Sequence, residues 1–187
     1  GVLAVRPAEC FSGALLAHRV HIPTKNYAQC LTHFAAYLIQ HADDEMVFSA
    51  PSKKSRDLRS LVDSSWGNCP EAMRSWFGYC ILWCGCAFSW RAKLEPCVAL
   101  SSRDAEAIAA VFCVKAALGF LIMLSEMGFA PNIPTHVHVD NKATVDSAHS
   151  EKISKESRFM AMRLKWLREM VRNDLIDMTH IATQNNY

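Results

Sequence analysis

The sequence predicts an α/β fold, a mixed five-stranded sheet with helices packed on it. Three strand candidates, residues 58–63, 76–82 and 87–90, are joined by short turns, as in an antiparallel meander. A long apolar helix candidate follows, and after it strand and helix candidates alternate as far as residue 181. This order, β-β-β-α-β-α-α-β, places parallel strands beside an antiparallel group.

Composition supports a globular protein. The chain has 187 residues, of which 51% are hydrophobic and 20% charged, enough for one domain with a core and part of another. The net charge is only +2, but Lys and Arg concentrate in residues 51–60 and 151–172. Such basic runs suit a polyanionic partner, although a solvated helix face is their more common meaning.

Neither a membrane span nor a disulfide framework is expected. The longest apolar run, residues 105–124, is interrupted by Lys115, and we find no signal peptide. The eight cysteines lie mostly in apolar stretches and form no C-x-x-C pair. We therefore predict buried, reduced thiols, with Cys84 and Cys86 as a weaker candidate for zinc ligands.

The first 48 residues are predicted to be helical. Residues 27–40 have apolar side chains at helical spacing, and Thr24 stands upstream as a candidate N-cap. This segment is too short to fold alone, so it is either a packing appendage or the tail of a preceding domain. Because the chain begins at Gly1 and ends at Tyr187 directly after an expected strand, we expect a piece of a longer polypeptide.

The long apolar helix is bounded by clear signals. Ser101 or Ser102 is a candidate N-cap, with Asp104 completing an imperfect capping box, and Gly128 followed by Pro131 ends the helix. The helix is apolar nearly all round, which predicts burial on more than one side. The neighbours of Glu106 on one face are small, so this face can lie close to a sheet: Ala109, Ala110, Cys113, Ala116 and Ala117.

The remaining elements follow from shorter patterns. Residues 63–68 are predicted to form the first turn, and residues 135–139 a strand beside the first one. Helices are predicted over 141–149 and 155–172, and a last strand over 175–181. The second of these helices is amphipathic, with five apolar side chains predicted to face inward: Phe159, Met162, Trp166, Leu167 and Met170.

Three acids stand where sheets present ligands. Asp63 lies near the end of the first strand, Glu106 in the early turns of the apolar helix and Asp140 at the end of the fourth strand. Converging carboxylates repel one another unless cations lie between them, and two-metal phosphodiester hydrolysis uses such a group. The ordinary alternative is an acid near a helix start together with an Asp-Asn turn.

A competing metal motif overlaps the third acid. His136, His138 and Asp140 alternate along one strand and resemble the H-x-H-x-D-H run of metallo-β-lactamase-type hydrolases, but Asn141 replaces the final His. The alternative without a metal places both histidines on a partly covered face of the strand. The aromatic strands are more often core than base-stacking platforms.

Several segments together resemble a known family. ALSSRDAEAIA is similar to ALSSTEAEYIA, and VHVDNKATVDSA to LYCDNQSAIALA, both from the ribonuclease H domain of copia-type (pseudovirus) retrotransposon Pol polyproteins. LVDSSWGNCPEAMRSWFGY and FSWRAKLEPCVALSS resemble that family's YSDASWANDPDTRRSTSGY and ISWKSKKQPTVALSS. Residues 1–48 look like the end of the preceding reverse transcriptase region.

The resemblance implies an RNase H-like fold over residues 49–187, truncated at its C-terminus, preceded by a reverse transcriptase tail in 1–48. It implies a metal-dependent ribonuclease that hydrolyses the RNA strand of an RNA–DNA hybrid, leaving a 5′-phosphate and a 3′-hydroxyl. Asp63, Glu106 and Asp140 would be catalytic residues and ligands of Mg²⁺ or Mn²⁺, two ions in all. The family's fourth acid belongs to a LADIFTK motif that is expected just after Tyr187.

The expected partners are the hybrid and the reverse transcriptase region of the same polyprotein, without a membrane. The resemblance implies an intracellular protein, in a cytoplasmic virus-like particle or the nucleus. The alternative function is a catalytically inactive RNase H-like module that packs or binds nucleic acid. Contacts to the sugar-phosphate chain are predicted for six residues: Ser64, Ser65, Ser101, Asn141, Lys155 and Arg163.

Overall fold

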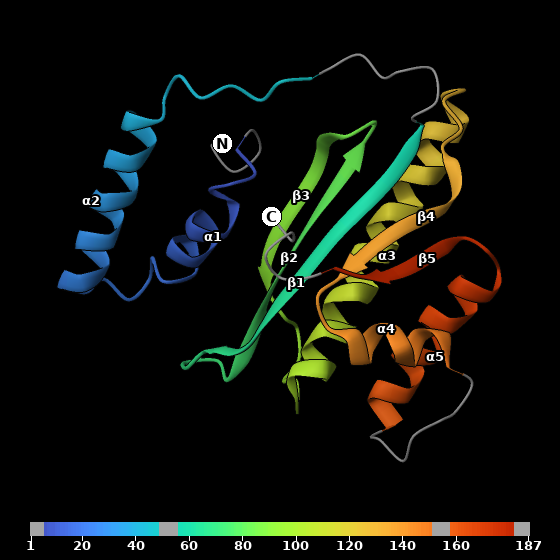
Figure 1. Ribbon diagram of the computed structural model, residues 1–187. Coiled ribbons are helices and arrows are strands. Elements are labelled where there is room, and N and C mark those ends of the chain that lie inside the picture. The colour runs from blue at the N-terminus through green and yellow to red at the C-terminus, as the bar shows by residue number, and fades with distance from the viewer. Residues whose placement is uncertain (1–5, 49–55, 151–157, 182–187) are drawn as a thin grey trace.

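The computed structural model describes residues 6–48, 56–150 and 158–181 (Figure 1). Two helices come first, then three strands, and the second half of the chain alternates helices and strands. The elements are α1 (Cys10–His18), α2 (Lys25–Gln40), β1 (Asp57–Cys69), β2 (Arg74–Trp83), β3 (Cys86–Leu94), α3 (Ser102–Glu126), β4 (Asn132–Val139), α4 (Lys142–His149), α5 (Arg158–Arg172) and β5 (Ile176–His180).

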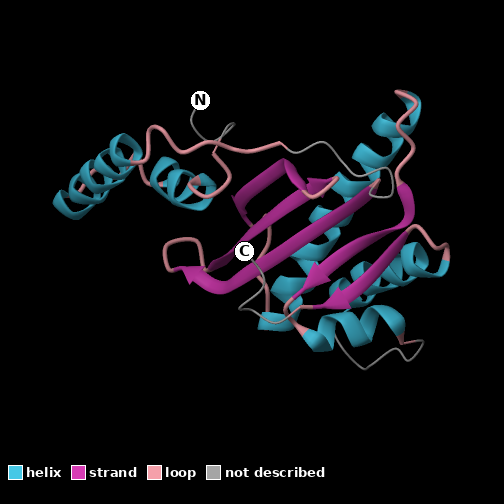
Figure 2. Ribbon diagram, turned by 45° about the horizontal axis from the view of Figure 1, so that its top comes forward, coloured by secondary structure: helices cyan, strands magenta, loops and turns pink. Residues whose placement is uncertain are grey.

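The five strands form one mixed sheet in the order β3-β2-β1-β4-β5. The pairs β1–β2 and β2–β3 are antiparallel, whereas β1–β4 and β4–β5 are parallel. Helices α3, α4 and α5 lie on one side of this sheet and α1 on the other (Figures 1 and 2). The predicted fold class is confirmed, including the fourth strand beside the first.

The predicted turn at residues 63–68 is wrong. Strand β1 continues to Cys69, because Ser64 and Ser65 still pair with Phe77 and Trp76 of β2. Gly67 has a positive φ of 64° and lies where the β1–β2 pairing is irregular, between Ser65 and Cys69. The Gly67-Asn68 pair, which suggested a turn, therefore marks an irregularity within a strand. The β1–β2 hairpin therefore extends beyond the point where β4 ends.

The core lies between the sheet and the first half of α3. Ala109, Ala110 and Cys113 are fully buried there and pack in one cluster with valines such as Val62 and Val137. Small side chains let the helix approach the strands closely, as the sequence pattern predicts. This close packing sets the distance between the first turns of α3 and strand β1.

The second half of α3 is more open than predicted. Leu124 is buried with Leu58 and Ile81, but Ile122 is 59% exposed and Met123 is also exposed. Within the described residues, α3 is the one helix whose length and composition would allow it to cross a membrane. Its first half lies in the protein core, and Lys115 lies 5.7 Å from the Trp166 ring centroid of α5.

Helix α5 packs with a different stripe from the one predicted. Met160, Leu164 and Leu167 are buried, whereas Met162 is 66% exposed. The buried residues follow the i, i+4, i+7 spacing, and Met162 lies on the opposite side of the helix from Leu164. The inward assignment of Met162 is therefore wrong, and the side chain of Phe159 lies outside the described residues.

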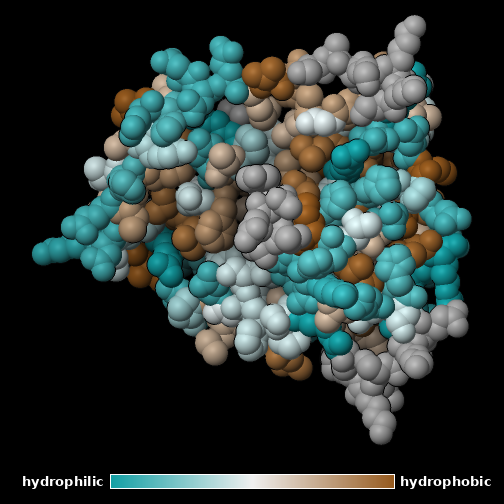
Figure 3. All heavy atoms as spheres, in the orientation of Figure 1, coloured by the Kyte–Doolittle hydropathy of each residue, from teal (hydrophilic) through white to brown (hydrophobic). Residues whose placement is uncertain are grey.

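The N-terminal helices join the sheet through α1. Phe11 and His18 of α1 both pack edge-on against Trp76 of β2, with ring centroids 5.8 and 5.6 Å from it. Helix α2 begins at its predicted cap, since the Thr24 hydroxyl accepts a hydrogen bond from the Tyr27 amide, but none of its residues is buried. Hydrophobic side chains reach the surface in this region of the molecule (Figure 3). The division at residue 48 stays a prediction.

All eight cysteines are free thiols. Cys10, Cys69 and Cys113 are buried, and Cys30 is exposed. Burial raises the pKa of the Cys113 thiol to about 12, so this side chain packs as a small apolar group. The prediction of reduced thiols is consistent with this arrangement.

Candidate active site

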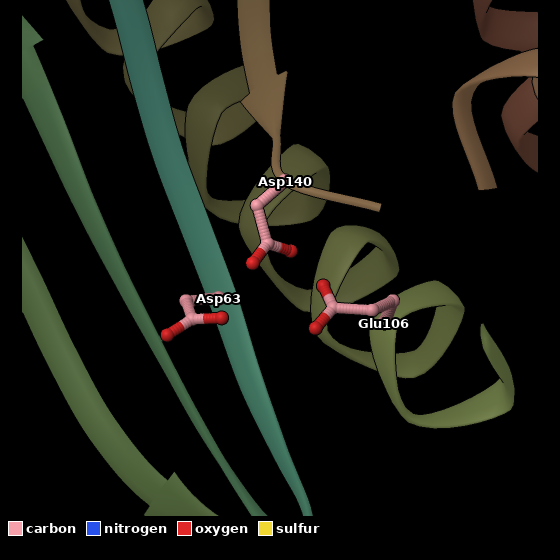
Figure 4. A group of neighbouring side chains, drawn as sticks. All are labelled: Asp63, Glu106 and Asp140. Carbon is pink, nitrogen blue, oxygen red and sulfur yellow. The ribbon is translucent and has the colours of Figure 1, made fainter. Parts of the chain in front are cut away.

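Three acids from three elements meet at the end of β4. Val62 of β1 pairs with Val139, the last residue of the parallel strand β4, so the residues that follow them, Asp63 and Asp140, lie side by side. Glu106 reaches them from the second turn of α3 (Figure 4). One carboxylate oxygen of each acid lies within 4.8 Å of the other two. The structure thus brings together the three residues predicted as metal ligands.

The start of α3 is fixed by hydrogen bonds that hold Glu106 in place. The Ser101 hydroxyl accepts a hydrogen bond from the Asp104 amide at 3.1 Å, which identifies Ser101 as the N-cap. The Asp104 carboxylate accepts from the Leu100 amide at 3.1 Å instead of reaching back to Ser101. This is the predicted imperfect capping box, and Glu106 follows directly after the capped turn.

The Glu106 carboxyl is buried with only 4% of the residue exposed. Burial, together with the nearby carboxylates of Asp140 and Asp63, raises its pKa to about 9. Its Oε1 accepts a hydrogen bond from the Ser64 amide at 3.1 Å, whereas its Oε2 is buried without a hydrogen-bond partner in the described part of the chain. Hard divalent cations prefer oxygen ligands. The three carboxylates offer such ligands, and Glu106 Oε2 is buried without a hydrogen bond that a cation would have to displace.

Ser64 connects two of the acids. Its amide donates to Asp63 Oδ1 at 2.8 Å as well as to Glu106 Oε1. Asp63 is exposed and Asp140 partly buried, so the group opens to solvent on the side away from Glu106. A cation could therefore enter from the Asp63 side and meet a preformed set of oxygens.

A fourth acid, Glu95, lies beside this group, and the sequence analysis did not identify it. It follows β3 directly, is fully buried, and accepts a hydrogen bond from the Ser64 hydroxyl at 3.1 Å. Burial raises its pKa to about 7. The available signal was an acid standing alone among apolar residues before Pro96, which by itself indicates nothing about its neighbours.

Five of the six residues predicted to contact nucleic acid make hydrogen bonds within the protein. Ser65 accepts a hydrogen bond from Asn68, and the side chain of Asn141 caps α4 by accepting from the Thr144 amide at 3.1 Å. Arg163 donates to Cys97 Sγ at 3.2 Å and lies 3.8 Å from Asp104, so it faces α3. Lys155 lies outside the described residues. Their role in nucleic-acid binding stays a prediction.

The two histidines of the competing motif belong to another cluster. His136 Nδ1 lies 3.3 Å from Asp177 Oδ2, and His138 Nδ1 hydrogen-bonds with the Thr179 hydroxyl at 2.7 Å. In the described ranges, the group of His, Cys, Asp and Glu that could hold a metal is the set of three acids alone. The geometry favours the acid set over a histidine or a Cys84–Cys86 site.

Comparison with known proteins supports the predicted resemblance. Over 185 residues, 99% of its length, the chain is 24% identical to the "Retrovirus-related Pol polyprotein from transposon TNT 1-94" of Nicotiana tabacum. The chain spans only 14% of that relative. No protein-family profile matches it.

Solved structures agree on the fold. The chain is similar to LC11-RNase H1, isolated from compost by a metagenomic approach, with a TM-score of 0.53 and 14% identity over 70% of this chain and 88% of the other. A second structure of LC11-RNase H1, in complex with an RNA/DNA hybrid, gives a TM-score of 0.52 and 11% identity over the same shares. The fold of this chain is therefore RNase H-like.

Proposed function

We propose that this chain is the ribonuclease H region of a retrotransposon Pol polyprotein and that it hydrolyses the RNA strand of an RNA–DNA hybrid. One observation carries the proposal: Asp63, Glu106 and Asp140 converge within 4.8 Å at the end of β4 in an RNase H-like sheet. The similarity to a Pol polyprotein over nearly the whole chain supports the biological context.

Asp63, Glu106 and Asp140 would hold two divalent cations, Mg²⁺ or Mn²⁺. Such cations supply an attacking water of lowered pKa and stabilise the leaving oxygen. The chain's own contribution is the placement of the ligands: the capped start of α3 aims Glu106, and the Ser64 amide orients Glu106 and Asp63 together. Because the raised pKa of Glu106 keeps it protonated without a cation, binding releases a proton from this carboxyl.

The substrate would be recognised by its sugar-phosphate backbone. The 2′-hydroxyl distinguishes RNA from DNA at such a site. Ser65 and Asn141 act as acceptors in their hydrogen bonds within the protein, so the Ser65 hydroxyl and the Asn141 side-chain NH2 would donate to the hybrid without losing these bonds. We expect the reverse transcriptase region of the same polyprotein as the second partner, reached through residues 1–48, and an intracellular location.

A strand-specific cleavage assay tests the proposal. An RNA–DNA hybrid labelled on either strand is incubated with the protein and Mg²⁺ or Mn²⁺, with EDTA as the blank. We expect cleavage of the RNA strand alone, lost in EDTA and in Asp140→Asn. Asp146→Asn is the matched control, since Asp146 is exposed on the neighbouring helix α4. Metal-independent cleavage, or cleavage unaffected by Asp140→Asn, would contradict the assignment.

The alternative is an inactive module that binds the hybrid or packs beside the reverse transcriptase. Helix α2 contacts α1 but has no buried residue, and its exposed surface suits a packing role. Hybrid binding by a folded, metal-binding protein without any cleavage would favour this alternative. A gel-shift experiment run beside the cleavage assay separates the two.

A further inference from the structure

Glu95 is a buried acid that the proposed chemistry does not use. None of the residue is exposed, and its backbone amide donates to the Ser75 carbonyl at 2.8 Å, which fixes it against the start of β2. Burying a carboxyl group is unfavourable unless its hydrogen bonds are satisfied, and Glu95 Oε2 has no partner in the described part of the chain. Because burying the Glu95 carboxyl with an unsatisfied oxygen is unfavourable for stability, we looked for a functional role for this residue.

The Glu95 carboxyl contacts the side chains of Ser64 and Ser75, and the contact with Ser64 connects it to the acid group. The Ser64 hydroxyl donates to Glu95 Oε1 at 3.1 Å, and the Ser64 amide donates to Asp63 and Glu106. Ser64 therefore contacts three carboxyl groups through two donors. If its hydroxyl is held, the peptide that carries its amide is held as well.

We propose, on the basis of the function proposed above, that Glu95 is a positioning residue: by accepting the Ser64 hydroxyl it fixes the Ser64 amide that orients Asp63 and Glu106 for a divalent cation. Glu95 does not act as a ligand itself. Its oxygens fall outside the group of mutually close ligand atoms, which contains only Asp63, Glu106 and Asp140 in the described residues. Partners behind metal ligands commonly change metal affinity by about 10–100-fold.

The neighbourhood of Glu95 supports a role through hydrogen bonding. Asp104 lies close enough to raise the pKa of Glu95, and Arg163, which lies 3.8 Å from Asp104, lowers it, although burial is the largest influence. The two charges shift the pKa of Glu95 in opposite directions, and burial influences it more than either charge does. An uncharged side chain of the same shape should then serve nearly as well as the acid.

The test measures Mn²⁺ binding by titration calorimetry on the full chain at pH 8. Glu95→Ala removes the acceptor, Ser64→Ala removes the donor, and each is expected to weaken Mn²⁺ binding by about tenfold. The double variant should bind no more weakly than either single variant, because both remove the same hydrogen bond. Glu95→Gln keeps an oxygen for the Ser64 hydroxyl and should stay within about threefold of the unmodified protein.

Controls separate positioning from general destabilisation. Glu9→Ala removes another buried acid, which directly precedes α1 on the opposite side of the sheet from α3, and should leave Mn²⁺ affinity unchanged. Thermal unfolding confirms that each variant is folded at the titration temperature. Unchanged Mn²⁺ affinity in Glu95→Ala, or additive losses in the double variant, would overturn the inference. If the unmodified protein binds no Mn²⁺, or binds it equally after Asp140→Asn, the proposed function fails instead.

Discussion

The two halves of α3 invert the usual distribution of side chains. In the first half, Asp104 and Glu106 are buried with 7% and 4% exposed, whereas in the second half Ile122 is 59% exposed. A helix selected for stability alone would place these residues the other way round. The comparison teaches that the first half is arranged around its carboxylates, and that the apolar composition of the second half is not explained by burial.

Burying acids in the first half of α3 lowers the stability of the folded protein. A buried carboxyl loses its hydration, and the neighbouring Asp140 and Asp63 add repulsion at Glu106. A hydrogen bond from the Ser64 amide offsets part of this cost at Glu106, and one from the Leu100 amide does the same at Asp104. On the function proposed above, a bound cation would relieve the rest, so metal binding would be coupled to folding through the first half of α3 and not through the second.

The largest expected effect comes from Glu106→Gln, which sharpens the contrast within α3. The amide cannot supply an anionic ligand, so Mn²⁺ binding should weaken by more than about 100-fold, beyond the effect of an outer partner. Titration calorimetry measures it. Glu126→Gln, at the exposed end of the same helix, is the control and should bind like the unmodified protein. Equal losses in both variants would mean that overall charge, not the site, governs binding.

The second half should respond only to changes at its buried side. Leu124 packs with Leu58, Ile81 and Ala117, so Leu124→Ala should lower the free energy of unfolding by about 3 kcal/mol. Ile122→Ala removes a similar volume from an exposed position and should change it by less than about 0.5 kcal/mol. Urea unfolding measures both, and a large loss in Ile122→Ala would show that another surface covers this half.

Sequence patterns predicted the parts of this helix that depend on local chemistry. The Ser101 cap, the small face of α3 and the stop at Gly128 follow from residue type and spacing. The convergence of Asp63 and Asp140 follows because parallel neighbours end at one edge of a sheet. This convergence needs only the knowledge that β1 and β4 pair.

Other features depend on register and packing, which spacing does not contain. Glu95 meets Ser64 only because β2 pairs with both β1 and β3 in one particular register. The exposure of Ile122 and Met162 depends on which helix faces have a neighbour, and both have apolar side chains that suggest burial. The continuation of β1 past Asp63 likewise depends on pairing with β2, which outweighs the local turn residues.

The pH dependence of stability without metal should reveal the buried acid. The unfolded state ionises Glu106 near its ordinary pKa of 4.5, while the folded state holds the proton up to about pH 9. Stability is therefore lost as pH rises through this window, at up to about 1.4 kcal/mol per pH unit.

Between pH 6 and pH 8 we expect the unmodified protein to lose about 2 kcal/mol more than Glu106→Gln. The difference between the two proteins cancels the contributions of other titrating groups to the pH dependence of stability. One such group is His138, whose pKa is lowered by burial. Urea unfolding in EDTA measures the two curves. Parallel curves would show that Glu106 ionises equally in both states, which contradicts its burial.

The smallest effect tests how the first half of α3 is anchored. Ser101 accepts the Asp104 amide, so Ser101→Ala should cost about 1 kcal/mol of stability, the usual contribution of an N-cap. Ser102 is exposed in the first turn, and Ser102→Ala should change stability by less than about 0.5 kcal/mol. Because the capped turn also aims Glu106, Ser101→Ala should weaken Mn²⁺ binding where Ser102→Ala does not. A stability loss without any change in binding would mean that the site tolerates a frayed helix start, and that contacts between α3 and β1 alone place Glu106.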